Sequence, residues 1–157
     1  MDIESFWQVY LHSLPAGQNP TADTYDFWHF CDNEKGANEL AKLTLQGSKT
    51  ATSSLLWAYE AEGETVPQAG ALSIITDWEG VPVCLIRTVE VRVRAFNEVD
   101  ERVAFDEGEG DRSLAYWRRV HWEAFSRECA EIGRQADETM PVVNEWFEVL
   151  FPPLQEG

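Results

Sequence analysis

The spacing of apolar residues predicts three main helices. In the first fourteen residues apolar side chains recur at helical intervals, and the pattern stops at Pro15, so we expect an amphipathic N-terminal helix at about residues 2–14. A second helix is expected to start at a cap formed by Asp32 or Asn33 and to end at Gly47, with an exposed loop after it. A third is expected to start near Asp111. Its apolar stripe would comprise Leu114, Trp117, His121, Ala124 and Phe125.

Strand signals occupy the second half of the chain. Residues 71–77 and 83–94 are rich in β-branched side chains, and residues 78–80 between them are typical of a hairpin turn. Residues 142–151 read as a final buried strand. Helices grouped apart from a mostly antiparallel sheet indicate the α+β class, and the long strand 83–94 suits a sheet that curls into a small barrel. We expect one domain over residues 1–157, with its core at about residues 25–151.

The charge of the chain limits its partners. The formal net charge is −16, although 44% of residues are hydrophobic and 12% are aromatic. A protein that binds duplex DNA usually presents a broad basic surface, so duplex DNA is not expected as a partner. A short single strand, a nucleoside or a metal ion held in one cleft remains compatible with this charge. The chain has no apolar run of about 20 residues and an acidic N-terminus, so we expect a cytoplasmic protein without a membrane partner.

Two polar segments are candidates for chemistry. Residues 47–54 place Lys49 among several hydroxyl side chains just after a helix end, where they could bind an oxyanion or phosphate. The spacing is not that of a P-loop, because position 42 is Lys where that motif needs Gly. The alternative is a solvated connection in which Thr50 or Thr52 caps a short helix at residues 53–60.

The second segment, residues 106–113, carries four carboxylates in its first six residues together with two glycines. It could supply a general base or hold Mg²⁺ or Mn²⁺ through carboxylate oxygens. The alternative is an acidic approach to a helix N-terminus, capped by Asp111. His12, His29 and His121 share no metal-ligand spacing, and we interpret each as structural.

Taken in order, these features resemble the ASCH domain family of the PUA-like superfamily, from about Trp28 to Phe151. The features that carry the resemblance are Trp28-His29-Phe30 with Asp32, residues 47–52, Asp77-Trp78, residues 107–113, Tyr116-Trp117 and His121. The resemblance implies a small β-barrel surrounded by helices. It also implies a cleft where the Lys/Thr loop meets the acidic segment.

The family resemblance implies a catalytic set of Lys49, Thr52 and Glu109. Bacterial members are associated with two activities, a metal-dependent ribonuclease in longer chains and removal of the acetyl group of N4-acetylcytidine in shorter ones. In the amidohydrolase reaction Lys49 would activate Thr52 or bind the oxyanion while Glu109 shuttles protons, without a cofactor. In RNA cleavage Lys49 would stabilise the pentacoordinate charge, and Glu109 or a bound metal would activate the nucleophile.

The length of the chain matches the longer group, so the first hypothesis is an RNA-directed hydrolase, a ribonuclease assisted by Mn²⁺ or Mg²⁺. The alternatives are an N4-acetylcytidine amidohydrolase and a non-catalytic RNA-binding regulatory module. The partner would be single-stranded RNA or a modified nucleoside. Substrate contacts are predicted for Thr50, Ser54, Trp28, Arg112, Ser113 and Tyr116, and metal contacts for Glu107, Glu109 and Asp111.

Overall fold

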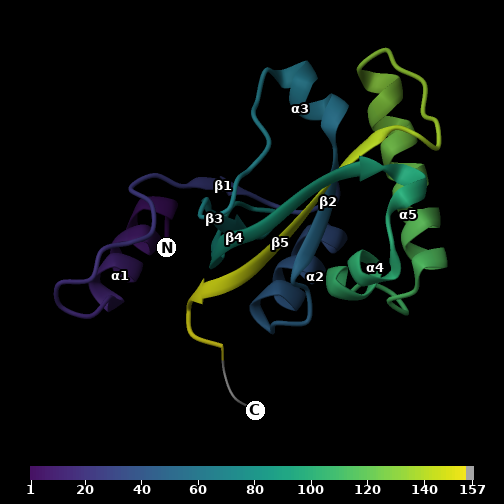
Figure 1. The fold of residues 1–157 in the computed structure, drawn as a ribbon. Helices are drawn as coiled ribbons and strands as arrows, with labels where there is room; N and C mark the ends of the chain where they lie inside the picture. The colour runs from purple at the N-terminus through teal and green to yellow at the C-terminus, as the bar shows by residue number, and fades with distance from the viewer. Residues whose placement is uncertain (155–157) are drawn as a thin grey trace.

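The computed structural model describes residues 1–154, in which five helices surround one mixed five-stranded sheet (Figure 1). The strands are β1 (Asp26–Trp28), β2 (Ala51–Leu55), β3 (Leu72–Thr76), β4 (Pro82–Ala95) and β5 (Pro141–Phe151). The helices are α1 (Ile3–Ser13), α2 (Glu34–Leu45), α3 (Leu56–Glu62), α4 (Glu101–Glu107) and α5 (Leu114–Glu131), with a 3₁₀ turn η1 (Phe96–Glu98). The last three residues, 155–157, lie outside the described part of the chain.

The sheet has the order β1-β3-β4-β5-β2 and curls into a half-barrel. Among the strand pairs of residues 1–154, only β1–β3 is parallel. The long strands β4 and β5 pair along most of their length, with register shifts at Leu85/Ile86 and Thr88/Glu90 that let them bend. The short strands β1 and β2 form the two edges. The α+β class and the PUA-like barrel predicted from the sequence are therefore confirmed.

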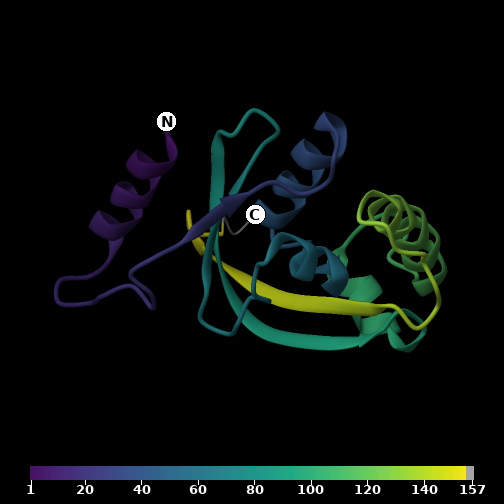
Figure 2. The same ribbon diagram turned by 90° about the horizontal axis from the view of Figure 1, so that it is seen from above.

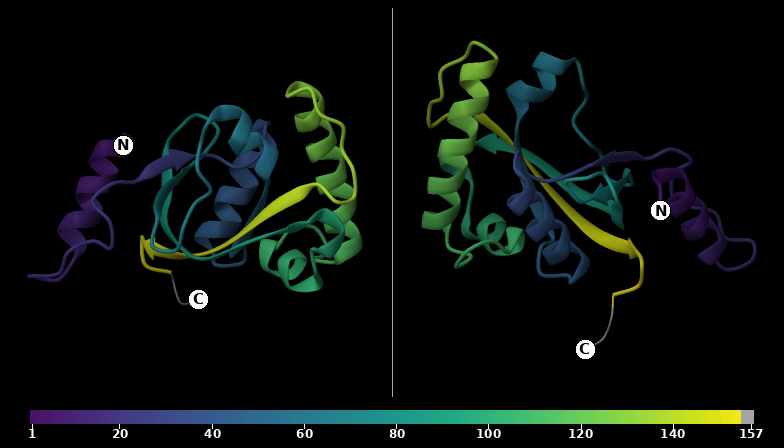
Figure 3. Two further views of the ribbon diagram at one scale, coloured as in Figure 1. Left: turned by 45° about the horizontal axis from the view of Figure 1, so that its top comes forward. Right: turned by 180° about the vertical axis from the view of Figure 1, so that it is seen from behind.

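Three apolar clusters fix the helices to this sheet. The α1 residues Phe6, Trp7 and Tyr10 pack against β3 and β4, and Leu40 and Ala41 of α2 join a second cluster with the same two strands. The third cluster packs α4 and α5 against β2 and β5. Consequently α1 and α5 lie at opposite ends of the molecule (Figure 2), with α2 between them (Figure 3).

Most of the predicted elements are present. Asn33 caps α2, the hairpin turn at residues 78–80 joins β3 to β4, and the final strand is β5. Helix α5 starts a little later than predicted, with Ser113 rather than Asp111 as its N-cap. In the described residues no helix is both long enough and apolar enough to cross a membrane.

The prediction of an exposed loop after Gly47 was wrong. Residues 51–55 form β2, and the helix expected at residues 53–60 starts at Leu56 as α3. Serine and threonine dominate this strand, so it lacks the apolar alternation that identifies most strands. Its hydrogen-bonded partner β5 lies about ninety residues further along the chain. The short strand β1 and helix α4 were also missed.

Candidate functional site

The turn after α2 brings Lys49 into the protein interior. Gly47 has a positive φ of 83°, and the backbone N–H groups of Ser48 and Lys49 both donate to the Leu43 carbonyl. The Lys49 side chain is 1% exposed, and its ammonium lies 3.0 Å from Glu109 Oε2 and 3.4 Å from Glu107 Oε1. A buried ammonium requires such partners, and here both come from the acidic segment.

Gly108 allows the acidic segment to approach this turn. Its φ is +71°, and a Cβ built there would lie 2.4 Å from the Ser48 carbonyl oxygen. The backbone N–H of Thr50 donates to the Asp106 carbonyl at 2.7 Å. The Lys/Thr segment and the acidic segment, which lie about sixty residues apart in sequence, therefore meet at one place.

Glu107, the last residue of α4, is the centre of a buried polar cluster. Ser53 Oγ donates to its carboxylate at 2.7 Å, the Trp117 indole N–H donates to the same oxygen, and His121 Nε2 lies 3.4 Å from the other oxygen. The His121 ring stacks on Trp117 with a centroid distance of 4.3 Å. Sequence reasoning assigned His121 to the apolar stripe of α5, whereas in the fold it also contacts this carboxylate.

The charges of this cluster are interdependent. Burial alone would raise the pKa of Glu107, but His121, Lys49 and the Ser53 hydroxyl outweigh burial and hold the pKa well below its usual range. Burial alone would lower the pKa of His121, but the Glu107 carboxylate outweighs it and raises that pKa. Glu107 is therefore ionised at neutral pH.

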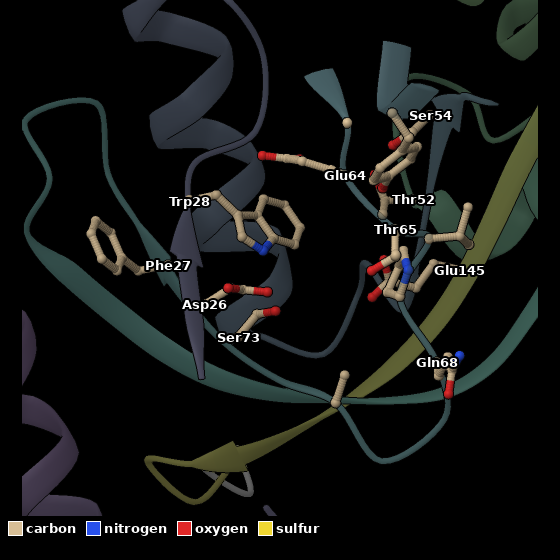
Figure 4. A pocket seen from close by; sticks show the side chains of 15 residues that line it. Asp26, Phe27, Trp28, Thr52, Ser54, Glu64, Thr65, Gln68, Ser73 and Glu145 are labelled. Atoms are coloured by element: carbon tan, nitrogen blue, oxygen red, sulfur yellow. The ribbon is translucent and has the colours of Figure 1, made fainter. Parts of the chain in front are cut away.

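A cleft of about 770 Å³ opens between the two edge strands of the half-barrel. The Trp28 indole extends from β1 into the cleft, and Thr52 and Ser54 of β2 lie on the opposite side, while Phe27 points away from it (Figure 4). The structure thus brings three predicted site residues together around one cleft. Neither Lys49 nor Glu109 is among the residues that line it.

Sequence reasoning missed Glu145, a buried carboxyl in the wall of this cleft. Glu145 of β5 is the direct cross-strand partner of Thr52, and its Oε2 accepts a hydrogen bond from Thr88 Oγ1 at 2.7 Å. Burial raises the pKa of Glu145, and the Thr88 hydroxyl opposes this only in part. The signal in the sequence was the polar pair Asn144-Glu145 inside a largely apolar strand.

Four residues that were predicted to contact the substrate instead stabilise the conformation of the acidic segment. Arg112, at a positive φ of 63°, donates to the Phe105 and Ser48 carbonyls, and Thr50 Oγ1 donates to the Asp106 carbonyl. Ser113 Oγ accepts from the Tyr116 backbone N–H as the N-cap of α5. The Tyr116 ring lies against Gly110. None of the four lines the cleft.

The predicted metal ligands do not fit a divalent cation. Glu107 and Glu109 both face the Lys49 ammonium, which already supplies the positive charge between them. Asp111 is exposed and accepts a hydrogen bond from the Ser113 backbone N–H. Across residues 1–154, no group of three or more His, Cys, Asp or Glu side chains is placed to hold a metal ion.

The fold and these motifs define an ASCH domain of the PUA-like class. The model of the ASCH domain family matches residues 26–151, which is most of the chain. The protein therefore belongs to the ASCH domain family.

Solved structures support this membership. An ASCH domain from Lactobacillus crispatus JV V101 is 40% identical, with a TM-score of 0.88 over 93% of this chain and 92% of that one. The protein EF3133 from Enterococcus faecalis V583 is 36% identical, with a TM-score of 0.82 over 94% of this chain and 87% of that one. A search of curated proteins found no match.

The Lys49→Met variant tests the ion pair at the base of the site. It leaves the Glu107 carboxylate buried without its ammonium partner, so we expect the free energy of unfolding to fall by about 3 kcal/mol in urea denaturation. The control is Lys42→Met on the exposed face of α2, which should change stability by less than about 0.5 kcal/mol. Equal losses in the two variants would contradict the assigned role of Lys49.

The raised pKa of His121 predicts a loss of stability at alkaline pH. Because the folded pKa lies above the unfolded value of 6.5, the protonated ring stabilises the fold fully below 6.5, and this contribution disappears as pH rises through the folded pKa. The free energy of unfolding should fall in that window by up to about 1.4 kcal/mol per pH unit.

His121→Phe keeps a ring on Trp117 and should abolish this slope, whereas His12→Phe, at an exposed position of α1, should retain it. Chemical denaturation between pH 6 and 9 measures both variants. A slope that survives in His121→Phe would refute the assignment.

Proposed function

We propose that this protein is an amidohydrolase that removes an acyl group from a modified cytidine-type nucleoside bound in the cleft between β1 and β2. The observation that carries the proposal is the lining of the cleft. It combines the Trp28 ring with the hydroxyls of Thr52, Ser54 and Ser73 and with three carboxyl groups, those of Asp26, Glu64 and Glu145. No Lys, Arg or His residue lines the cleft in the described part of the chain.

This lining suits a nucleoside better than a nucleotide. An indole offers a stacking surface for any base, and hydroxyl and carboxyl groups can hydrogen-bond to base edges and ribose. Three carboxyl groups without a cation would repel a phosphate at close range. The net charge of −16 acts in the same direction over the whole surface.

The same observations make the other two hypotheses weaker. A metal-assisted ribonuclease needs cationic groups at the scissile phosphate, whereas Lys49 is buried between two carboxylates and Arg112 is bound to backbone carbonyls. ASCH domains, as members of the PUA-like class, bind RNA in general. A non-catalytic RNA-binding role would therefore use the same cleft, but it would not require a nucleophile there.

Within the proposed reaction the catalytic set has two parts. Thr52 faces the cleft and is the candidate nucleophile for the acyl carbonyl. Lys49, three residues earlier, fixes the beginning of β2 through its ion pairs with Glu107 and Glu109. Its ammonium is already held by two carboxylates and is therefore poorly suited to accept the Thr52 proton.

Thr52→Val tests the proposal directly. The variant keeps a β-branched side chain in β2 and removes only the hydroxyl, so we expect release of cytidine from N4-acetylcytidine, with chelator present, to fall at least about 100-fold. Thr24→Val, at an exposed position far from β2 in sequence, is the matched control and should retain the wild-type rate. Product is followed by chromatography, and thermal unfolding checks that both variants fold.

Wild-type turnover that depends on Thr52 and survives chelator supports the amidohydrolase. RNA fragments formed only with Mn²⁺, without deacylation, would support the ribonuclease instead. Binding of single-stranded RNA without any turnover would support the regulatory module. Either of the last two results would overturn the proposal.

A further inference from the structure

The nucleophile proposed above needs a partner that can remove its proton. A threonine hydroxyl is a weak nucleophile until a neighbouring base accepts its proton. Ser53 belongs to the polar cluster around Glu107, and Thr52 faces the other side of β2 because side chains alternate along a strand. Lys49, which precedes β2, carries an ammonium held by Glu107 and Glu109. An ammonium has no lone pair that could accept the Thr52 proton, so a carboxyl in the cleft wall is the better candidate for the base.

Glu145 is in the right position for this task. It is the residue directly opposite Thr52 in the antiparallel β2–β5 pair, and both side chains line the cleft. Directly opposed residues in such a pair have Cβ atoms about 5 Å apart, which places a glutamate carboxyl within reach of a threonine hydroxyl. Figure 4 shows both side chains on the same side of the cleft, facing Trp28.

The hydrogen bonds of Glu145 leave one carboxyl oxygen available. Oε2 accepts from Thr88 Oγ1 at 2.7 Å, and Oε1 has no protein partner among the described residues. In residues 1–154 the only fully buried side-chain nitrogen or oxygen without a partner is Arg94 Nε, so Oε1 is not sealed from the cleft. Thr88 thus orients the carboxyl and leaves its second oxygen for proton transfer.

Few charged groups compete with Glu145 for this role. The titratable groups that share the cleft are Asp26 of β1, Tyr59 of α3 and Glu64 beyond α3. Glu64 is exposed, whereas Glu145 is 5% exposed. Burial raises the pKa of Glu145 toward the pH at which a general base works best, and burial also raises the pKa of Tyr59, which keeps that phenol protonated.

We propose that Glu145 is the general base and acid of the cleft, which takes the proton of Thr52 and passes it to the leaving nitrogen. This inference rests on the proposed function. It replaces Lys49 and Glu109 as the proton-transfer partners of Thr52.

Glu145 alone can carry out every proton transfer that the reaction requires. As Thr52 Oγ bonds to the acyl carbon, the Glu145 carboxylate accepts the hydroxyl proton. When the C–N bond breaks, the protonated Glu145 gives this proton to the departing exocyclic nitrogen, which leaves as the free amine of cytidine. Water then attacks the acyl-threonine ester, Glu145 takes one proton from it and returns that proton to Thr52 Oγ, and the carboxylic acid is released.

The test compares Glu145→Gln with Glu123→Gln in full-length protein, using N4-acetylcytidine over pH 5 to 9. Glutamine can still accept the Thr88 hydrogen bond but cannot take up a proton. We expect kcat for Glu145→Gln to fall at least about 100-fold and to lose the rise with pH that the wild type shows through the Glu145 pKa. Glu123→Gln, which changes an exposed carboxyl of α5 that does not line the cleft, should keep that rise.

A third variant separates a chemical role from a structural one. Thr88→Val removes the hydrogen bond that favours the Glu145 carboxylate, so the rise of kcat should move to higher pH. The presence or absence of this shift also tests the proton-transfer role of Glu145 if the Glu145→Gln protein does not fold.

The proposal for Glu145 is overturned if wild type is active and Glu145→Gln behaves like Glu123→Gln, or if the profile of Thr88→Val does not move. In either case the amidohydrolase function itself stands. A wild-type protein with no activity on N4-acetylcytidine overturns both.

Discussion

The site depends on one buried interaction, the contact of the Lys49 ammonium with Glu107 and Glu109. A charge that is 1% exposed is tolerated only with ionised partners at hydrogen-bonding distance. These partners tie the start of β2 to the turn between α4 and α5. The same Glu107 carboxylate binds Ser53, Trp117 and His121, so the position of β2, and with it that of the cleft, depends on this polar cluster.

Local patterns predicted the parts of the fold that local forces determine. The N-terminal helix, the Asn33 cap, the β3–β4 hairpin and the final strand all follow from periodicity and turn residues. Strand β2 does not, because it is held by β5 and by Glu107 rather than by an apolar pattern of its own. Its hydroxyl side chains look like a loop until these distant partners are in place.

The candidate site was predictable to a similar extent. Motif resemblance identified Lys49, Glu109 and Thr52, but it could not show that Thr52 lines the cleft whereas Lys49 and Glu109 form an ion pair outside its lining. Glu145 carries no motif, and its relation to Thr52 follows only from the register of β5 on β2. The acidic lining likewise depends on the fold, because Asp26, Glu64 and Glu145 come from three distant segments.

The central claim is that the cleft accepts a nucleoside and rejects a phosphate. Calorimetric titration of the Thr52→Val protein with N4-acetylcytidine and with its 5′-monophosphate tests it most directly, because this variant should bind without turnover. The account predicts tighter binding of the nucleoside, with a difference that shrinks as salt is added. Tighter binding of the monophosphate would contradict it.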